Sequence, residues 1–336
     1  MNNPTVVFTR PREVVIEDRD KPTLQSGEFL VQTRRTLIST GTELTIFSGE
    51  FPEKSAWADY ARFPFRAGYS NVGRVIEVAP DVDKSWIGSR VAGRAPHALY
   101  CAVQADQAHP ILHDGIPDDE ATFHELAATV ANGVRRAGVE WGESVVIYGA
   151  GILGQLAARF CRLSGTRPVI VADVAEPRLK LLPDEPAVVP VNPAREDVRA
   201  TVEKATRGRL ADVVFEVTGN QNLITEEFKC LREQGRFVLL SSPRGATPFD
   251  FHDLCNCPSF TIIGTHVRSH PRTGELDLPW TMKRNIELFF DLIADGEISI
   301  GSLITHRAPY TEAPRLYNML LEDRSAALGV VLEWPD

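Results

Sequence analysis

The pattern Gly149-x-Gly151-x-x-Gly154 is the segment of this sequence most suited to bind a ligand. A tight glycine turn exposes backbone N–H groups, and a helix that begins there adds a favourable dipole for a phosphate. The first glycine permits the turn, the second lets a pyrophosphate approach the backbone, and the third lets helix and strand pack closely. The segment therefore predicts a dinucleotide site.

An acidic residue follows at a suitable distance. Asp173 lies roughly 20 residues after Gly154, where a carboxylate can accept hydrogen bonds from the ribose diol. The same carboxylate would repel a 2′-phosphate, so NAD is expected rather than NADP. Arg178 could in principle receive that phosphate, but a solvated arginine on a helix starting near Glu176 is the favoured interpretation.

The elements around these residues fit this prediction. Residues 145–148 form an apolar, β-branched strand before the glycines, and Leu153 to Leu163 carry apolar residues at helical spacing. Gly165 supplies a helix stop. A second strand, 169–172, ends at Asp173.

The same alternation continues along the chain. A helix is expected over 121–137, strands over 187–190, 212–217, 236–240 and 260–264, and helices over 196–206 and 223–232. Right-handed crossovers then give a doubly wound parallel sheet of order 3-2-1-4-5-6, which binds ligands beyond the strand C-termini. The candidate cofactor residues are Thr42, Thr129, Gly149, Gly151, Ile152, Leu153, Gly154, Asp173, Arg178, Thr218, Ser241 and Thr265.

The flanking segments differ in character. Residues 1–120 show short β patterns separated by Gly and Pro, which predict a β-rich, barrel-like domain. Residues 267–336 contain two helical and two strand patterns and are expected to rejoin it. The predicted domains are thus 1–120 plus 267–336, with a Rossmann domain, 121–266, inserted between them.

The composition and net charge of the chain argue against several classes of protein. The 336 residues carry 36 basic and 45 acidic side chains, a net charge of −9, which argues against a nucleic-acid partner. No apolar run reaches membrane-spanning length, and the N-terminus lacks a targeting pattern, so a cytoplasmic protein is expected. Five scattered cysteines suggest no disulfide framework, and Cys255-x-Cys257 is expected to be two ordinary thiols.

The order of these segments resembles the medium-chain dehydrogenase/reductase superfamily over essentially the whole chain. The segments that carry the resemblance are 39–43, 67–73, 125–127, 149–154 and 305–307. It implies a GroES-like barrel domain with an inserted Rossmann domain. Within that superfamily, Ser39-Thr40-Gly41-Thr42-Glu43 is similar to the branch that includes the bacteriochlorophyllide hydroxyethyl dehydrogenases.

The resemblance breaks at the metal ligands. Zinc alcohol dehydrogenases carry Cys-Gly-Thr-Asp and Gly-His-Glu where this chain places Thr40 and Tyr69 at the cysteine and histidine ligand positions. A third ligand, a glutamate, corresponds to Glu125. Catalytic Zn²⁺ needs three protein ligands, and the four cysteines of a structural zinc lobe are missing, so a zinc-free member with no metal ligands is expected.

Without zinc, a hydride transfer still needs a proton donor or acceptor at the substrate oxygen. The resemblance matches Thr42 to a family threonine that touches the alcohol, whereas the next relay position is Thr45, not histidine. Tyr69 is expected to act as a hydrogen-bond donor or an acid of lowered pKa, or merely to fill the emptied metal site. Glu125, paired with an arginine or a backbone amide, and its neighbour His124, a helix-start residue, complete the catalytic candidates. His97 is expected to be a strand-edge histidine.

Three functions remain open from sequence. The first is an NAD(H)-dependent oxidoreductase for a small-molecule secondary alcohol or ketone. The second is a zinc-free quinone or enoyl reductase, and the third a non-catalytic NAD-binding sensor or scaffold. A homodimer is also expected, because residues 260–263 form an apolar edge strand and the superfamily often dimerises through the last strand of its nucleotide domain.

Overall fold

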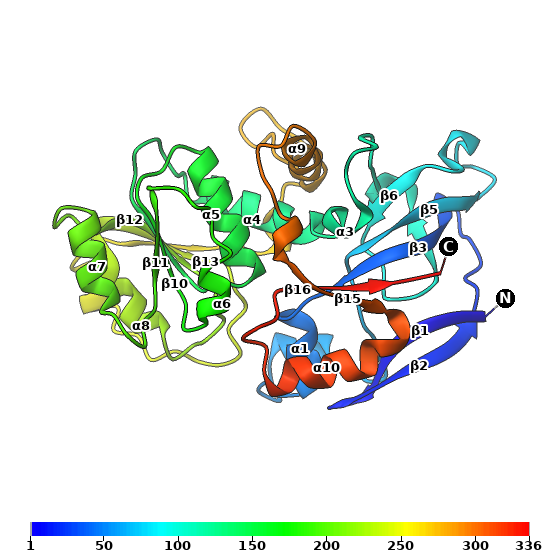
Figure 1. The fold of residues 1–336 in the computed structure, drawn as a ribbon, viewed down its shortest axis with the longest axis horizontal. Helices are drawn as coiled ribbons and strands as arrows, with labels where there is room; N and C mark the ends of the chain where they lie inside the picture. Colours follow the sequence, from blue (N-terminus) through cyan, green and yellow to red (C-terminus); the bar gives the residue numbers. More distant parts are fainter. Residues whose placement is uncertain (1, 336) are drawn as a thin grey trace. The chain divides into compact units, whose positions relative to one another are not determined.

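The computed structural model describes residues 2–335, which divide into two compact units. One unit contains the residues up to Glu125 together with those from Lys283 onward, and the other runs from Leu126 to Met282. Figure 1 follows the chain through both units by colour. Within residues 2–335, no helix combines the length and apolar character needed to cross a membrane.

The second unit is built on a six-stranded sheet in which every pairing is parallel. Its order is β11-β10-β9-β12-β13-β14, which is the predicted 3-2-1-4-5-6 order, so the predicted fold class is confirmed. The interior strand β10 is buried at every residue, as expected for a sheet covered on both faces. The strands are β9 (Val145–Tyr148), β10 (Val169–Ala172), β11 (Val188–Val191), β12 (Ala211–Glu216), β13 (Leu231–Leu239) and β14 (Thr261–Gly264).

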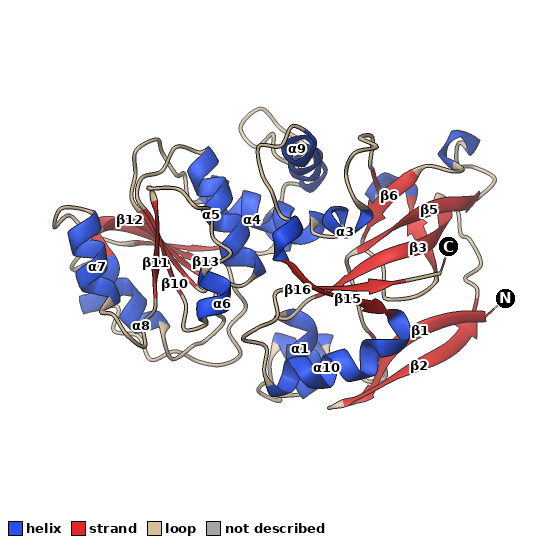
Figure 2. Ribbon diagram, viewed as in Figure 1, coloured by secondary structure: helices blue, strands red, loops and turns tan. Residues whose placement is uncertain are grey.

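Helices cover both faces of this sheet, with α7 and α8 on one side and α4 and α5 on the other (Figure 2). The helix α5 ends at Leu163, and Gly165 follows with φ +83°, as the predicted stop requires. The helices of this segment are α4 (His124–Arg136), α5 (Ile152–Leu163), α6 (Glu176–Leu179), α7 (Val198–Ala205) and α8 (Ile224–Glu227), with shorter turns η3 (Phe228–Cys230), η4 (His252–Asn256) and η5 (Val267–Ser269).

Two predicted helices are wrong in extent. The helix expected over 223–232 stops at Glu227, where Phe228 stacks on Phe237 with ring centroids 4.0 Å apart, and the turn η3 then leads into β13 at Leu231. The helix expected over 121–137 is divided into α3 (Asp118–Ala121) and α4, with Phe123 fully buried at the joint. Core packing overrides helical pattern at both places.

The first unit contains a three-stranded sheet, β2-β1-β4, and a seven-stranded sheet, β15-β16-β3-β5-β6-β8, in which β7 also pairs with β3. Its strands are β1 (Asn2–Arg10), β2 (Glu13–Asp20), β3 (Glu28–Ile38), β4 (Phe65–Arg66), β5 (Asn71–Val78), β6 (Arg90–Gly93), β7 (Tyr100–Gln104), β8 (His109–Pro110), β15 (Ile304–Pro309) and β16 (Gly329–Glu333). Its other elements are α1 (Thr42–Ser48), α2 (Ala56–Tyr60), α9 (Met282–Ala294), α10 (Ala313–Glu322), η1 (Lys84–Trp86), η2 (Ala105–Gln107), η6 (Gly301–Leu303) and η7 (Tyr310–Glu312).

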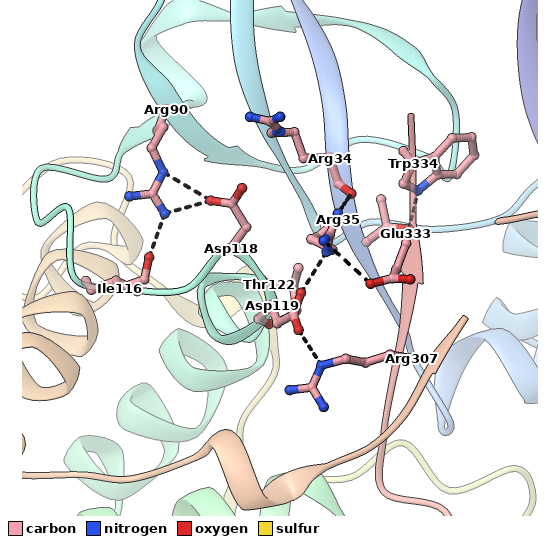
Figure 3. Close-up of polar contacts among 11 residues, drawn as sticks. Arg34, Arg35, Arg90, Ile116, Asp118, Asp119, Thr122, Arg307, Glu333 and Trp334 are labelled. Atoms are coloured by element: carbon pink, nitrogen blue, oxygen red, sulfur yellow. Dashed lines mark hydrogen bonds and ion pairs between the residues drawn. The ribbon is translucent and has the colours of Figure 1, made fainter. Parts of the chain in front are cut away.

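The C-terminal segment is an integral part of this unit. Strand β16 lies between β3 and β15, antiparallel to the first and parallel to the second. Figure 3 shows how Asp119 of α3 accepts hydrogen bonds from Arg35 of β3, at 2.8 Å, and from Arg307 of β15. Arg35 also lies 3.5 Å from Glu333 of β16. Ion pairs therefore fasten strands from both ends of the sequence to α3.

Candidate functional site

The glycine turn of the second unit has the geometry of a phosphate cradle. Gly149 has φ +107°, a conformation that favours glycine. A Cβ on Gly154 would lie 1.8 Å from the Gly149 carbonyl oxygen, so only glycine permits this approach of helix to turn. Around Gly151, which caps α5, a Cβ would meet no atom within 4 Å, and the space beside the backbone is open. With Ile152 and Leu153 in the first turn of α5, this cradle fits a pyrophosphate.

Asp173 lies beside this turn and orders it. One carboxylate oxygen accepts a hydrogen bond from the Ala150 amide at 2.7 Å, and the other accepts one from the Ala175 amide at 2.8 Å. Each oxygen keeps a second lone pair, so the carboxylate can still accept from ribose hydroxyls. Arg178 lies on α6 (Glu176–Leu179), as expected; it is partly buried, and its backbone carbonyl accepts from Gln155 at 2.8 Å.

A buried acid that sequence reasoning missed organises the other strand ends. Glu216, the last residue of β12, is fully buried and accepts from the Thr218 amide and hydroxyl, both at 2.6 Å. It also accepts from the Gly219 amide at 2.9 Å and from the Ser241 hydroxyl. Glu216 thus fixes the two turns that carry Thr218 and Ser241. The sequence signal that could have identified Glu216 is an acidic residue within an apolar strand that is followed by Thr and Gly.

The remaining cofactor candidates take different places. The Thr265 amide donates to the Leu239 carbonyl at 3.0 Å, which holds the end of β14 against β13. Thr129 is partly buried on α4.

Near Glu216, the fully buried Glu227 has no hydrogen-bond partner among residues 2–335 for either carboxylate oxygen. Burial, followed by the charge of Glu216, raises the pKa of Glu227 to about 9.

In the first unit, Tyr69 lies among hydroxyl groups. Its OH donates to the Ser39 Oγ at 2.7 Å, and Ser39 lies in the turn between β3 and α1, whose first residue is Thr42. Burial raises the pKa of Tyr69 above its usual value, and the Ser39 and Thr42 hydroxyls oppose that shift only in part. The alternative of an acid of lowered pKa is therefore wrong. Tyr69 is a neutral hydrogen-bond donor at physiological pH.

A buried polar network lies behind this turn. Glu43, 1% exposed, accepts from the Ser39 amide at 3.0 Å, contacts His97 Nε2 at 3.0 Å and accepts from the Tyr317 hydroxyl. His97 is fully buried, and its carbonyl accepts from the Val6 amide of β1 at 2.9 Å, so it lies at the edge of that strand as expected. Gly68 explains the close packing, since its φ is +100° and a Cβ there would lie 2.5 Å from the His97 nitrogen. This network fixes the turn that presents Thr42.

Glu125 forms an ion pair with Arg94. The guanidinium donates to the carboxylate at 2.7 Å and also lies 5.5 Å from the centre of the Tyr69 ring. Burial raises the pKa of Glu125 to about 6, although Arg94 acts in the opposite direction. The expected pairing of Glu125 with an arginine is present. Sequence reasoning did not single out Arg94, because nothing in the local pattern indicates its distant partner.

His124 begins α4 and is fully buried. Its Nδ1 lies 3.1 Å from the Ala121 carbonyl oxygen, and its ring centroid is 6.1 Å from that of His109. Burial, then the charge of His109, lowers the pKa of His124 to about 3. Because the His124 ring is buried and neutral, it fits the role of a residue that begins a helix better than the role of a catalytic base.

The side chains at the family's zinc-ligand positions do not fit that metal. Thr40 supplies a hydroxyl, Tyr69 stays protonated and donates to Ser39, and Glu125 is already paired with a guanidinium. Three strong N, S or O donors are needed for a catalytic Zn²⁺. Among the described residues, no group of three His, Cys, Asp or Glu side chains is placed to hold a metal ion.

Comparisons with known proteins agree with this fold. A family model described as zinc-binding dehydrogenase matches residues 153–282. The chain is 28% identical over 335 residues to L-threonine 3-dehydrogenase of Pyrococcus furiosus, covering 90% of each chain. It is 23% identical over 372 residues to sorbitol dehydrogenase 1 of Saccharomyces cerevisiae, covering 100% of this chain and 99% of that protein.

A solved structure extends the comparison. A putative zinc-binding dehydrogenase from Sinorhizobium meliloti, bound to NADP, superposes with a TM-score of 0.82 at 19% identity, covering 99% of this chain and 100% of that one. At that identity the structure supports the fold alone, whereas the family model and the curated relatives support a relationship to the zinc-binding, alcohol dehydrogenase-like proteins.

Proposed function

We propose that this protein is an NAD(H)-dependent oxidoreductase that interconverts a secondary alcohol and a ketone without a catalytic zinc. The observation that carries the proposal is the glycine cradle beside Asp173 in a chain that also presents the neutral hydroxyls of Tyr69 and Thr42. The relatives support the reaction class, because they are named as a threonine dehydrogenase and a sorbitol dehydrogenase.

The bound cofactor supplies or accepts the hydride, and the chain must stabilise charge on the substrate oxygen. Ketone reduction builds negative charge on that oxygen, and preorganised hydroxyl donors are effective partners for it. Tyr69 keeps its proton because its pKa is raised, so its O–H, which donates to Ser39 in the free protein, can turn to the substrate oxygen and donate there. Thr42 begins α1 beside the same tyrosine and provides the second hydroxyl.

The choice of NAD over NADP rests on Asp173, whose carboxylate would face a 2′-phosphate. The Sinorhizobium structure carries NADP, but at 19% identity it supports the fold alone. We expect NADH to bind at least about tenfold tighter than NADPH, which corresponds to roughly 1.4 kcal/mol. Fluorescence titration of both nucleotides tests this, and Asp173→Ser should narrow the gap. Equal affinities in the unmodified protein would count against NAD.

Zinc independence rests on the pairing of Glu125 with Arg94 and on the protonated Tyr69. Purified protein should contain no stoichiometric zinc by elemental analysis. A chelator should leave its turnover unchanged. Activity that disappears with the chelator and returns with zinc would refute this part of the proposal.

Exchange of labelled hydride from NADH tests the reaction itself. The panel contains ketones, enones and, because of the similarity of residues 39–43, a macrocycle bearing an acetyl group, which is the ketone that reduction converts to a hydroxyethyl group. Label in a product alcohol supports the proposal, and label only at an enone carbon favours a double-bond reductase. NADH binding with no transfer to any member favours a non-catalytic sensor.

A further inference from the structure

A hollow of about 490 Å³ opens in the first unit beside Tyr69, and three arginines line it: Arg19, Arg66 and Arg94. Among residues 2–335, no aspartate or glutamate side chain contributes to the lining. The chain as a whole is acidic, with a net charge of −9, so this basic lining is a local departure from its composition. A concave, basic hollow favours an anionic ligand.

The three guanidinium groups are not equivalent. Arg19 lies 2.7 Å from Glu17, and Arg94 lies 2.7 Å from Glu125, so each has a carboxylate partner. Arg66 is exposed on β4, with no hydrogen bond or ion pair of its side chain within the described residues. Its backbone is fixed by pairing with Val7 of β1. Arg66 therefore gives the hollow an uncompensated positive charge at a defined position.

The rest of the lining suits a hydroxylated molecule. Tyr60 and Tyr69 supply phenol groups, while Phe65 and Pro96 supply apolar surface. A guanidinium forms paired hydrogen bonds with the oxygens of a carboxylate or a phosphate. The volume lies within the range of small-molecule sites. Tyr69 belongs both to this hollow and to the group of hydroxyls proposed to face the reacting oxygen.

We propose that this hollow binds the oxyanion of the substrate, with Arg66 as its principal partner, so that the substrate is a polyhydroxylated compound bearing a carboxylate or a phosphate. That the ligand of this hollow is a substrate follows from the proposed dehydrogenase function. The binding of an anionic polyol at Arg66 can be measured without turnover, which separates the two proposals.

Calorimetric titrations in the presence of saturating NADH provide the test. The probes are gluconate, glucitol 6-phosphate and neutral glucitol, each added to wild type, Arg66→Gln and the control Arg62→Gln. Arg62 is an exposed arginine of the same segment that does not line the hollow. We expect at least one anionic polyol to bind tenfold or more tightly than glucitol. Arg66→Gln should abolish that preference, and Arg62→Gln should retain it.

The outcomes distinguish a carboxylate from a phosphate as the anionic group of the ligand. Preference for gluconate alone identifies a carboxylate substrate, and preference for glucitol 6-phosphate alone identifies a phosphate. Equal binding of all three polyols, no binding of either anion, or a preference that survives Arg66→Gln overturns the proposal. Arg66-dependent binding of an anion without hydride transfer to any ketone upholds the assignment of the hollow and rejects the dehydrogenase function.

Discussion

Arg94 and Glu125 form a 2.7 Å ion pair in which the Glu125 side chain is 4% exposed and the Arg94 side chain 51% exposed. The arginine thus reaches solvent while neutralising a buried acid. Arg94→Met should lower the free energy of unfolding by about 1–3 kcal/mol, because it leaves that acid without its charged partner. Urea denaturation measures this change. Arg94→Lys should recover part of the loss, and in a double-mutant cycle Glu125→Leu should remove most of the penalty.

The two later glycines of the turn should respond differently to alanine. Gly151→Ala should fold normally, since its Cβ enters open space, but that methyl group should obstruct a pyrophosphate and weaken NADH binding at least tenfold. Gly154→Ala should lower the melting temperature, because its Cβ would overlap the Gly149 carbonyl. Thermal unfolding combined with NADH titration separates these effects. Unchanged NADH affinity in Gly151→Ala would contradict the cradle.

The hydroxyl donors should act on turnover and not on cofactor affinity. Thr42→Val and Tyr69→Phe should each lower kcat roughly 10²–10³-fold, as for loss of one donor to a developing oxyanion, with NADH affinity nearly unchanged. Tyr310→Phe is the matched control, because that ring stacks on Trp334 and its hydroxyl has no hydrogen bond to Tyr69, Ser39 or Thr42 within residues 2–335. Steady-state kinetics check both variants. Wild-type turnover in both would mean that another group supplies the proton.

Glu227 should make stability depend on pH. Its pKa in the folded protein is about 9, against 4.5 ordinarily, so the folded state holds its proton over a range where the unfolded state has lost it. The free energy of unfolding should therefore fall by several kcal/mol as pH rises from 4.5 to about 9.

Glu227→Met should remove this decline, so that the variant becomes increasingly more stable than wild type toward pH 9. Glu226→Met, at an exposed neighbour that pairs with Lys229, is the control and should keep the wild-type slope. Thermal unfolding at several pH values gives the slopes. Identical slopes for wild type and Glu227→Met would show that Glu227 ionises normally.

Strand β14 should join two copies of the chain. It is at the edge of the sheet, pairs there with β13, and leaves Ile262 44% exposed. An uncovered apolar edge of this kind tends to pair with another strand. We expect a homodimer in sedimentation velocity at micromolar concentration, and Ile262→Lys should shift it toward monomer. Ile87→Lys, at an exposed isoleucine of the first unit, should not. A wild-type monomer would refute this prediction.

Local patterns were sufficient for the nucleotide sheet. Apolar strands, glycine stops and Asp173 follow one another along the sequence, and right-handed crossovers leave one plausible strand order. The polar contacts around Tyr69, in contrast, join residues that are far apart in the sequence. Glu43 and Tyr317 are 274 residues apart, and Arg94 and Glu125 are 31 apart. Periodicity carries no information on such pairs, because tertiary packing alone brings them together.

The place of β16 between β3 and β15 has a consequence during synthesis on the ribosome. The first unit cannot complete its larger sheet until residues 329–333 have left the exit tunnel, whereas every strand of the second unit has by then been made. The nascent chain must therefore carry an unfinished β-sheet through most of translation. During that interval β3 exposes the edge that β16 later covers, and this edge is where a ribosome-associated chaperone would be needed.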